Sequence, residues 1–312
     1  MSLSRTAKTE QFYLETASSL LRQFRISTGM VRWSEDPLAF YRWIQDRVES
    51  WKPATWRVNR ASLVFYFESA GENELASMIK NIGSERCARV STNTSAQKAK
   101  TLPTSDIKQI LDFLEKKPGP SEILLGLWLL AGRITGLRPS EWENAVLEGE
   151  KLIVRNAKTT NGRSHGPSRT LLLHDLPGEQ KEVVFLFIQG LQKRLSETGS
   201  MSRIYGTAKR RLHRICREIW PNRKKYPTLY SGRHQFSADL KRSGVSEEEI
   251  AALFGHATVR TAMMHYGRKN YGEDGYAFVQ ADKTNVESVR KYEGVSYLKS
   301  RKSTDCGPEE II

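Results

Sequence analysis

A polar segment between Ser84 and Pro103 constrains the fold of this chain more than any other feature. Its sequence, SERCARVSTNTSAQKAKTLP, is poor in apolar residues and rich in Ser, Thr and Lys, a composition typical of linkers. A chain of 312 residues is long enough for two domains that each have a core. We therefore expect a helical domain over residues 1–90, a linker over 84–103 and a second domain over 104–302.

The first domain is expected to be a bundle of four short helices. One helical face would carry five apolar residues, which are Tyr13, Ala17, Leu20, Leu21 and Phe24. Asp36 is a good N-cap residue and precedes a proline, so it predicts a helix that runs to Val48. Two further helices are expected over residues 53–69 and 73–82.

The second domain should open with a helix for which Thr104 is the predicted N-cap. Four apolar residues then follow a helical stripe, namely Ile107, Ile110, Leu111 and Leu114. A Pro-Gly-Pro sequence ends this helix, and a buried helix begins at Ser121.

The hydrophobic period then changes. Residues 151–158 and 169–175 are expected to form two strands joined by a polar turn, with helices again from Val183 to about Tyr297. The predicted fold class is mainly α with a small antiparallel β-sheet in the second of two domains. Residues 303–312 are expected to be a disordered tail.

The chain carries an excess of positive charge. Lys and Arg number 49 against 35 Asp and Glu, for a net charge of +14 and a pI of about 9.7. Such a field attracts polyanions, of which nucleic acid is the commonest in a cell. The segment Arg203–Lys225 is especially basic and should form a helix with one apolar face, although a merely solvated basic face is the alternative. The candidates for contacts with phosphate groups are Arg57, Arg60, Lys209, Arg210, Arg211, Arg214 and Arg217.

Three cysteines, at positions 87, 216 and 306, are far apart and odd in number, which argues against a disulfide framework. The longest apolar run, residues 123–131, is too short to span a bilayer, and the first residues lack the apolar core of a signal peptide. These features favour a cytoplasmic protein without a membrane contact. Since no Cys or His pair has the spacing of metal ligands, no metal site is expected.

Four separated segments contain residues that could carry chemistry. TGLRPSEW holds Arg138 and Glu141, and Lys158 ends the first predicted strand. TLYSGRHQFSADL and LFGHATVRTAMMHYG hold the remaining candidates, which are Tyr230, Arg233, His234, His256 and Tyr266. Each has an ordinary interpretation when taken alone: a surface ion pair, a lysine in a turn or a buried core histidine.

Taken together and in this order, the four segments resemble the catalytic domain of the tyrosine recombinases, the phage-integrase family. That family has an Arg in a TGLR-x-x-E segment, a Lys on a β-hairpin, an H-x-x-R-H segment, a G-H segment and a Tyr near the end. This sequence departs from the pattern at Tyr230, where most members have His. Tyr266 also follows His256 by ten positions, one more than the commonest spacing. Tyr271 and Tyr276 are therefore alternative nucleophiles.

The resemblance implies that DNA is cleaved and rejoined through a 3′-phosphotyrosine intermediate on Tyr266. Arg138 and Arg233 would clamp the non-bridging oxygens, with His256 as a third donor, and Lys158 would protonate the leaving 5′-oxygen. A phenol at position 230 could still donate a hydrogen bond to the phosphate. Glu141 and His234 would give structural support. The energy of the broken bond is retained, so neither ATP nor another cofactor is implied.

The implied partner is double-stranded DNA with a specific recombination site. The family assembles as a homotetramer in the synaptic complex and as a monomer or dimer otherwise, and an accessory DNA-binding protein is a further candidate partner. The layout resembles the simple Cre or Xer type, with residues 267–302 docked on a neighbouring protomer or, as the alternative, packed on their own catalytic domain. Integration, transposon resolution and chromosome dimer resolution stay open. So do two other classes, a type IB topoisomerase and a non-catalytic regulator.

Overall fold

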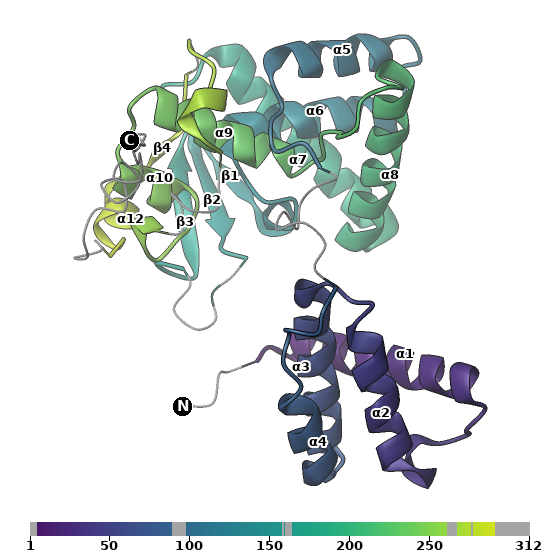
Figure 1. The fold of residues 1–312 in the computed structure, drawn as a ribbon. Helices are drawn as coiled ribbons and strands as arrows, with labels where there is room; N and C mark the ends of the chain where they lie inside the picture. Colours follow the sequence, from purple (N-terminus) through teal and green to yellow (C-terminus); the bar gives the residue numbers. More distant parts are fainter. Residues whose placement is uncertain are drawn as a thin grey trace, which may run out of the picture. The chain divides into compact units, whose positions relative to one another are not determined.

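The computed structural model describes residues 5–88, 98–157, 159, 164–260, 267–275 and 277–290. Lys158, Tyr266, Tyr276 and the predicted tail 303–312 lie outside the described residues. The chain divides into two compact units, Met1–Ala96 and Gln97–Ile312, each of which is described by itself (Figure 1).

Unit 1 is helical. Its elements are α1 (Ala7–Thr28), a 3₁₀ turn η1 (Trp33–Glu35), α2 (Pro37–Val48), α3 (Pro53–Ser69) and α4 (Asn73–Lys80). The predicted cap of α2 is confirmed, since Asp36 accepts a hydrogen bond from the backbone N of Ala39 at 2.8 Å. Aromatic side chains form much of the core, where Phe40 meets Phe24 and Phe67 edge to face.

Arg60 differs from the sequence-based expectation. Arg57 is exposed as predicted, but Arg60 is half-buried and its Nη1 donates to the Ile82 carbonyl at 3.0 Å. The chain leaving α4 presents carbonyl groups that need donors, and Trp56 Nε1 also donates to Ile82 and to Gly83. Arg60 is therefore a structural residue of unit 1 and not an exposed cation.

Unit 2 combines helices with one small sheet. Its helices are α5 (Thr104–Glu115), α6 (Pro120–Thr135), α7 (Gly178–Thr198), α8 (Met201–Ile219), α9 (Ser231–Arg242), α10 (Glu247–Leu253) and α12 (Lys283–Glu287). Among the described residues, two 3₁₀ turns, η2 (Glu141–Asn144) and η4 (Lys269–Tyr271), accompany four strands, β1 (Val146–Glu148), β2 (Lys151–Arg155), β3 (Ser168–Leu172) and β4 (Gln280–Ala281). The predicted fold class, mainly α with a small antiparallel sheet, is confirmed.

Helix α6 is the centre of unit 2. It is largely buried, and α5, α7, α8 and α9 all pack against it. The strands pair antiparallel in the order β1-β2-β3-β4, with Val154 opposite Arg169 in the β2–β3 ladder. Helices α10 and α12 pack together, with α10 against β3 and β4, as Figure 1 shows on the side away from α8.

Several boundaries differ from those expected. Thr104 is the first residue of α5 and Pro103 occupies the cap position, so the N-cap prediction for Thr104 is wrong. Its backbone N and Oγ1 instead donate to the carboxylate of Glu273, which fills the role of the missing cap. Strands β1 and β4 were not predicted, because segments of three and two residues are too short to show a period.

The segment after η4 packs on its own unit. Strand β4 pairs with β3, where Leu171 faces Ala281, and the Arg290 backbone N donates to Ala257 O at 3.0 Å. Val279 and Val289 are buried in the core of unit 2. The expectation that this segment docks on a neighbouring protomer is therefore wrong for the described part of residues 267–290. The physical reason is that β4 covers an edge of β3 that would otherwise expose unpaired backbone groups.

No helix in the described part of the chain has both the length and the apolar character that crossing a membrane requires.

Deletion of residues 276–312 should destabilise unit 2, because it removes β4 together with the buried Val279 and Val289. Burial of a valine stabilises a fold by roughly 1.5–3 kcal/mol, so we expect a loss of about 3–6 kcal/mol in the free energy of unfolding. Chemical denaturation measures the change. Deletion of residues 291–312 alone is the control, because it keeps β4, Val279 and Val289, and this protein should be more stable than the one with the longer deletion. Equal stability of the two truncated proteins would contradict the packing described here.

Candidate active site

A buried carboxylate, Glu141, lies at the centre of the candidate site. Its side chain has no exposed surface, and three guanidinium groups surround it, those of Arg138, Arg169 and Arg233. Burial by itself would raise the pKa of Glu141, but the positive charges of Arg169, Arg233 and Arg138 hold the pKa well below its usual range. The carboxylate is therefore ionised and binds the three cations together.

Arg138 reaches Glu141 through a tight turn at the end of α6. Gly136 caps this helix with φ +64°, and a Cβ at this position would come 2.2 Å from the ring of Phe236. The turn places both the backbone N and the side chain of Arg138 on the same carboxylate. The backbone N donates to Oε2 at 2.8 Å, and Nη1 donates to Oε1 at 2.5 Å.

Arg233 approaches from the first turn of α9. Its Nη1 donates to the Gly136 carbonyl at 2.7 Å and lies 3.6 Å from Glu141 Oε2. Its Nη2 donates to the Phe254 carbonyl at 2.9 Å, and the guanidinium carbon lies 4.1 Å from the centroid of the Phe254 ring. These contacts join the ends of α6 and α10 to one side chain.

His256 follows α10 and lies against Arg138, with 3.3 Å between His256 Nε2 and Arg138 Nη2. Gly255, the residue before it, has φ +69° and no room for a Cβ, which would lie 2.2 Å from Asn156 Oδ1. Burial, followed by the charges of Arg233 and Arg138, lowers the pKa of His256 well below its usual range. The imidazole is therefore neutral at pH 7 and can both donate and accept a hydrogen bond.

Arg169 belongs to the same cluster and was not among the residues singled out in the sequence. It lies on β3 with its side chain completely buried, and its Nη2 donates to Glu141 Oε2 at 2.8 Å. The sequence did indicate its burial, because Arg169 lies two residues before the core residue Leu171 and therefore on the same, inner face of the strand. A buried arginine on a strand needs an anionic partner, and the sequence did not show which one.

The site is closed in this structure. The side chain of Arg138 is 10% exposed, whereas those of Arg233 and Glu141 have no exposed surface. An anion that enters the cluster would meet three guanidinium groups against one carboxylate, so the local charge favours an anion. Atoms that cover Arg233 must move before a ligand can touch it.

Two further predicted residues lie at the start of α9, Tyr230 of the predicted catalytic set and His234 of the predicted structural support. Tyr230 is the N-cap residue of this helix, and its ring centroid is 5.3 Å from that of His234 in an edge-on arrangement. Burial, together with the charges of Lys100 and Arg233, lowers the pKa of His234 to about 4. His234 is therefore also neutral at pH 7.

The structure places the neighbours of the two remaining candidates, Lys158 and Tyr266. Asn156, two residues before Lys158, is buried, and its Nδ2 donates to the Gly166 carbonyl at 2.8 Å. Gly267, directly after Tyr266, accepts a hydrogen bond from Lys241 Nζ at 2.9 Å. A Cβ on Gly267 would lie 2.2 Å from the His234 carbonyl, so the chain passes close to α9 at this point.

Helix α8 presents a basic face as predicted. Leu212, Ile215 and Cys216 are buried. Four of the five predicted cations of this helix are exposed, namely Lys209, Arg210, Arg214 and Arg217. Arg211 is intermediate in exposure and forms an ion pair with Glu122 of α6.

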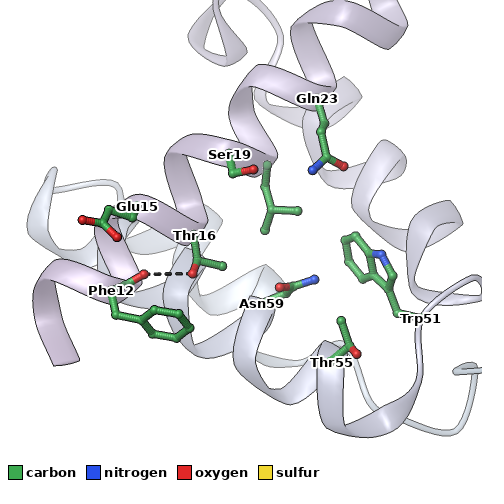
Figure 2. A pocket seen from close by; sticks show the side chains of 9 residues that line it. Phe12, Glu15, Thr16, Ser19, Gln23, Trp51, Thr55 and Asn59 are labelled. Carbon is green, nitrogen blue, oxygen red and sulfur yellow. Dashed lines mark hydrogen bonds between the residues drawn. The ribbon is translucent and has the colours of Figure 1, made fainter. Parts of the chain in front are cut away.

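A hollow of about 420 Å³ lies between α1 and α3 in unit 1. Figure 2 shows that Glu15, Ser19 and Gln23 line it from α1, with Thr55 and Asn59 on α3 opposite. None of the candidate catalytic residues lines this hollow.

A model of the phage integrase family matches residues 100–273. This range is more than half of the chain, and it includes every residue of the Glu141 cluster. The chain belongs to the phage integrase family. Its members are tyrosine recombinases, and the order of Arg138, Arg233 and His256 in the cluster is the order of the family motifs. No curated protein matches the chain closely enough to count as a relative.

Several solved structures of the same family are similar to this chain. XerH recombinase in a post-cleavage complex with palindromic difH shares 15% identity over 90% of this chain and 77% of its own, with a TM-score of 0.45. A lambda integrase dimer bound to a COC′ core site shares 15% identity over 88% of this chain and 84% of its own, with a TM-score of 0.42. The Tn1549 transposon integrase with circular intermediate DNA shares 13% sequence identity over 83% of this chain and 96% of its own, with a TM-score of 0.41. The assignment rests on the family match and not on these values.

The stability of this phage integrase family member should decrease as the pH falls below about 6.5. The unfolded chain protonates His256 near that pH, whereas the folded site keeps it neutral, so the unfolded state binds more protons. At pH 5 the resulting loss is about 2 kcal/mol in the free energy of unfolding. Chemical denaturation at pH 7.5 and pH 5 should show a smaller pH dependence for His256→Gln than for the natural protein. The same pH dependence in both would contradict a neutral His256.

Proposed function

We propose that this protein is a site-specific recombinase that cleaves and rejoins duplex DNA through a 3′-phosphotyrosine intermediate on Tyr266. The observation that carries the proposal is the Glu141 cluster, which brings Arg138, Arg233 and His256 together from three separate segments. A phosphodiester that reacts by displacement spreads negative charge onto its non-bridging oxygens. Fixed guanidinium and imidazole donors stabilise such charge.

Each predicted residue has a role in this reaction. Arg138 and Arg233 would donate to the non-bridging oxygens, and neutral His256 would donate a third hydrogen bond or accept the phenol proton. The oxygen of Tyr266 attacks phosphorus, the P–O5′ bond breaks, and the leaving 5′-oxygen receives a proton from Lys158. Rejoining is the reverse reaction with a 5′-hydroxyl as the nucleophile. Tyr230, next to His234 at the start of α9, would donate to the same phosphate.

The charge distribution supports duplex DNA as the partner. The exposed cations of α8 and Arg57 of unit 1 could neutralise backbone phosphates, while Arg60 and Arg211 are engaged within the protein. We further infer a homotetramer on a specific site during strand exchange, as in the family. Unit 1 and the linker 84–103 would then serve as the core-binding domain and its connection to the catalytic domain.

A type IB topoisomerase remains the second candidate, because it needs the same donors without exchange of strands between sites. Relaxation of supercoiled plasmid that lacks any special sequence would favour it. A recombinase instead requires a pair of sites and yields rearranged products.

The covalent intermediate is the direct test of the proposed nucleophile. A nicked suicide substrate that carries the recombination site should leave a protein–DNA adduct that resists SDS, because loss of the short nicked strand prevents rejoining. Peptide mapping should locate the DNA on Tyr266, and Tyr266→Phe should abolish the adduct while site-specific binding persists. Tyr271→Phe is the matched control, since Tyr271 is an exposed tyrosine on η4. Attachment to Tyr271 or Tyr276 would refute the assignment.

The role of Lys158 can be tested through the leaving group. If Lys158 protonates the 5′-oxygen, Lys158→Ala should slow cleavage by roughly 10²–10⁴-fold, the usual contribution of a general acid. A substrate with sulfur at the bridging 5′ position has a leaving group that needs no proton, and it should restore most of the rate. A variant that stays equally slow on the sulfur substrate would rule out this role.

A further inference from the structure

Arg169 touches three parts of the candidate site at once. Its Nε donates to the Leu253 carbonyl at the end of α10 at 2.8 Å. Its Nη1 donates to Asn156 Oδ1 at 2.5 Å, and the guanidinium contacts both oxygens of Glu141, with Nη2–Oε2 at 2.8 Å and Nη1–Oε1 at 3.3 Å. One side chain therefore connects the end of β2, the end of α10 and the carboxylate that binds Arg138.

In this structure Arg169 is engaged within the protein, since its Nε, Nη1 and Nη2 each donate to a protein acceptor. Its side chain has no exposed surface, and strand pairing holds its backbone opposite Val154 on β2. Arg138 differs, because it lies on a turn and its side chain is partly exposed. An effect of Arg169 on a phosphate is then carried by the residues that it holds.

Glu141 is the route by which such an effect can reach the phosphate. Its carboxylate accepts from Arg138 and Arg169 and lies 3.6 Å from Arg233. An ionised carboxylate has about four acceptor positions, and each one that Arg169 fills is one that Arg138 and Arg233 need not fill. The charge of Arg169 also leaves three cations against one anion, which raises the attraction for a phosphate in a buried site.

We propose that Arg169 is a positioning residue of the recombination reaction, which holds Glu141 so that Arg138 and Arg233 can stabilise the charge of the scissile phosphate. This inference rests on the proposed function. Asn156 and the Leu253 carbonyl fix the plane of the Arg169 guanidinium, and that plane sets the orientation of Glu141. Loss of Arg169 would leave Arg138 and Arg233 to neutralise Glu141 alone, with fewer donors directed at the phosphate.

The test compares cleavage of two suicide substrates by Arg169→Met and by the natural protein. One substrate has an ordinary scissile phosphodiester, and the other has a methylphosphonate there, in which a methyl group replaces one charged oxygen. On the phosphodiester, single-turnover cleavage by Arg169→Met should be about 10²-fold slower, as expected for misplaced donors. On the neutral methylphosphonate the loss should be no more than a few fold, because little charge needs to be stabilised.

The conservative variant Arg169→Lys provides a second measurement if Arg169→Met does not fold. A lysine ammonium keeps the positive charge but cannot hold Glu141 in the planar, two-pronged way of a guanidinium. We expect a loss of about tenfold on the phosphodiester and none on the methylphosphonate. Thr170→Val is the matched control, because Thr170 is the next residue on β3 and faces the opposite side of the strand. It should cleave both substrates at the natural rate.

A variant of Arg169 that loses the same factor on both substrates would overturn the inference, since that is the result of a purely structural role. Natural rates for Arg169→Lys and Arg169→Met on the phosphodiester would also overturn it. Failure of the natural protein to form an adduct with either substrate would instead overturn the proposed function, and the inference with it.

Discussion

The buried carboxylate of Glu141 is the interaction on which the catalytic unit depends. An ionised carboxylate without exposed surface is costly unless cations and hydrogen bonds compensate for the lost water. Here Arg138, Arg169 and Arg233 supply them, and these residues come from the turn after α6, from β3 and from α9. Folding of the unit and assembly of the site are therefore the same event, because Glu141 can be buried only when all three segments are in place.

The same arrangement suits the chemistry of a phosphodiester. Three fixed guanidinium groups around one carboxylate leave an excess of positive charge, and His256 stays neutral because it is buried and lies beside those cations. A neutral imidazole can accept the proton of a phenol. An imidazolium cannot, because both of its ring nitrogens already carry a proton. Arg233 is covered in this structure, so its proposed contact with a phosphate requires a rearrangement that exposes it. The charged groups of the site are thus already in contact with one another, while Arg233 and Glu141 have no exposed surface.

Backbone conformation fixes the two turns that deliver the site residues. Gly136 and Gly255 both have positive φ, and at each position a Cβ would collide with a neighbouring side chain. The first turn sends Arg138 back to Glu141, and the second places His256 beside Arg138. Glycine is therefore required at both positions, because any side chain there would collide with its neighbours and would disfavour the positive φ of the turn.

The sequence by itself determined the helical character of both units, the cap at Asp36 and the family motifs, because these depend on residues that are close in the chain. Hydrophobic periodicity predicted the fold class, and the order Arg138, Glu141, Arg233, His256 carried the resemblance to the family. Only the tertiary structure showed that Arg169 joins the cluster, since its partners Glu141, Asn156 and Leu253 are 13 to 84 residues away. Tertiary contacts also decided that β4 and Val289 pack on their own unit, where an uncovered edge of β3 was available. Periodicity reports which face of a segment is buried, but it does not report which surface buries that face.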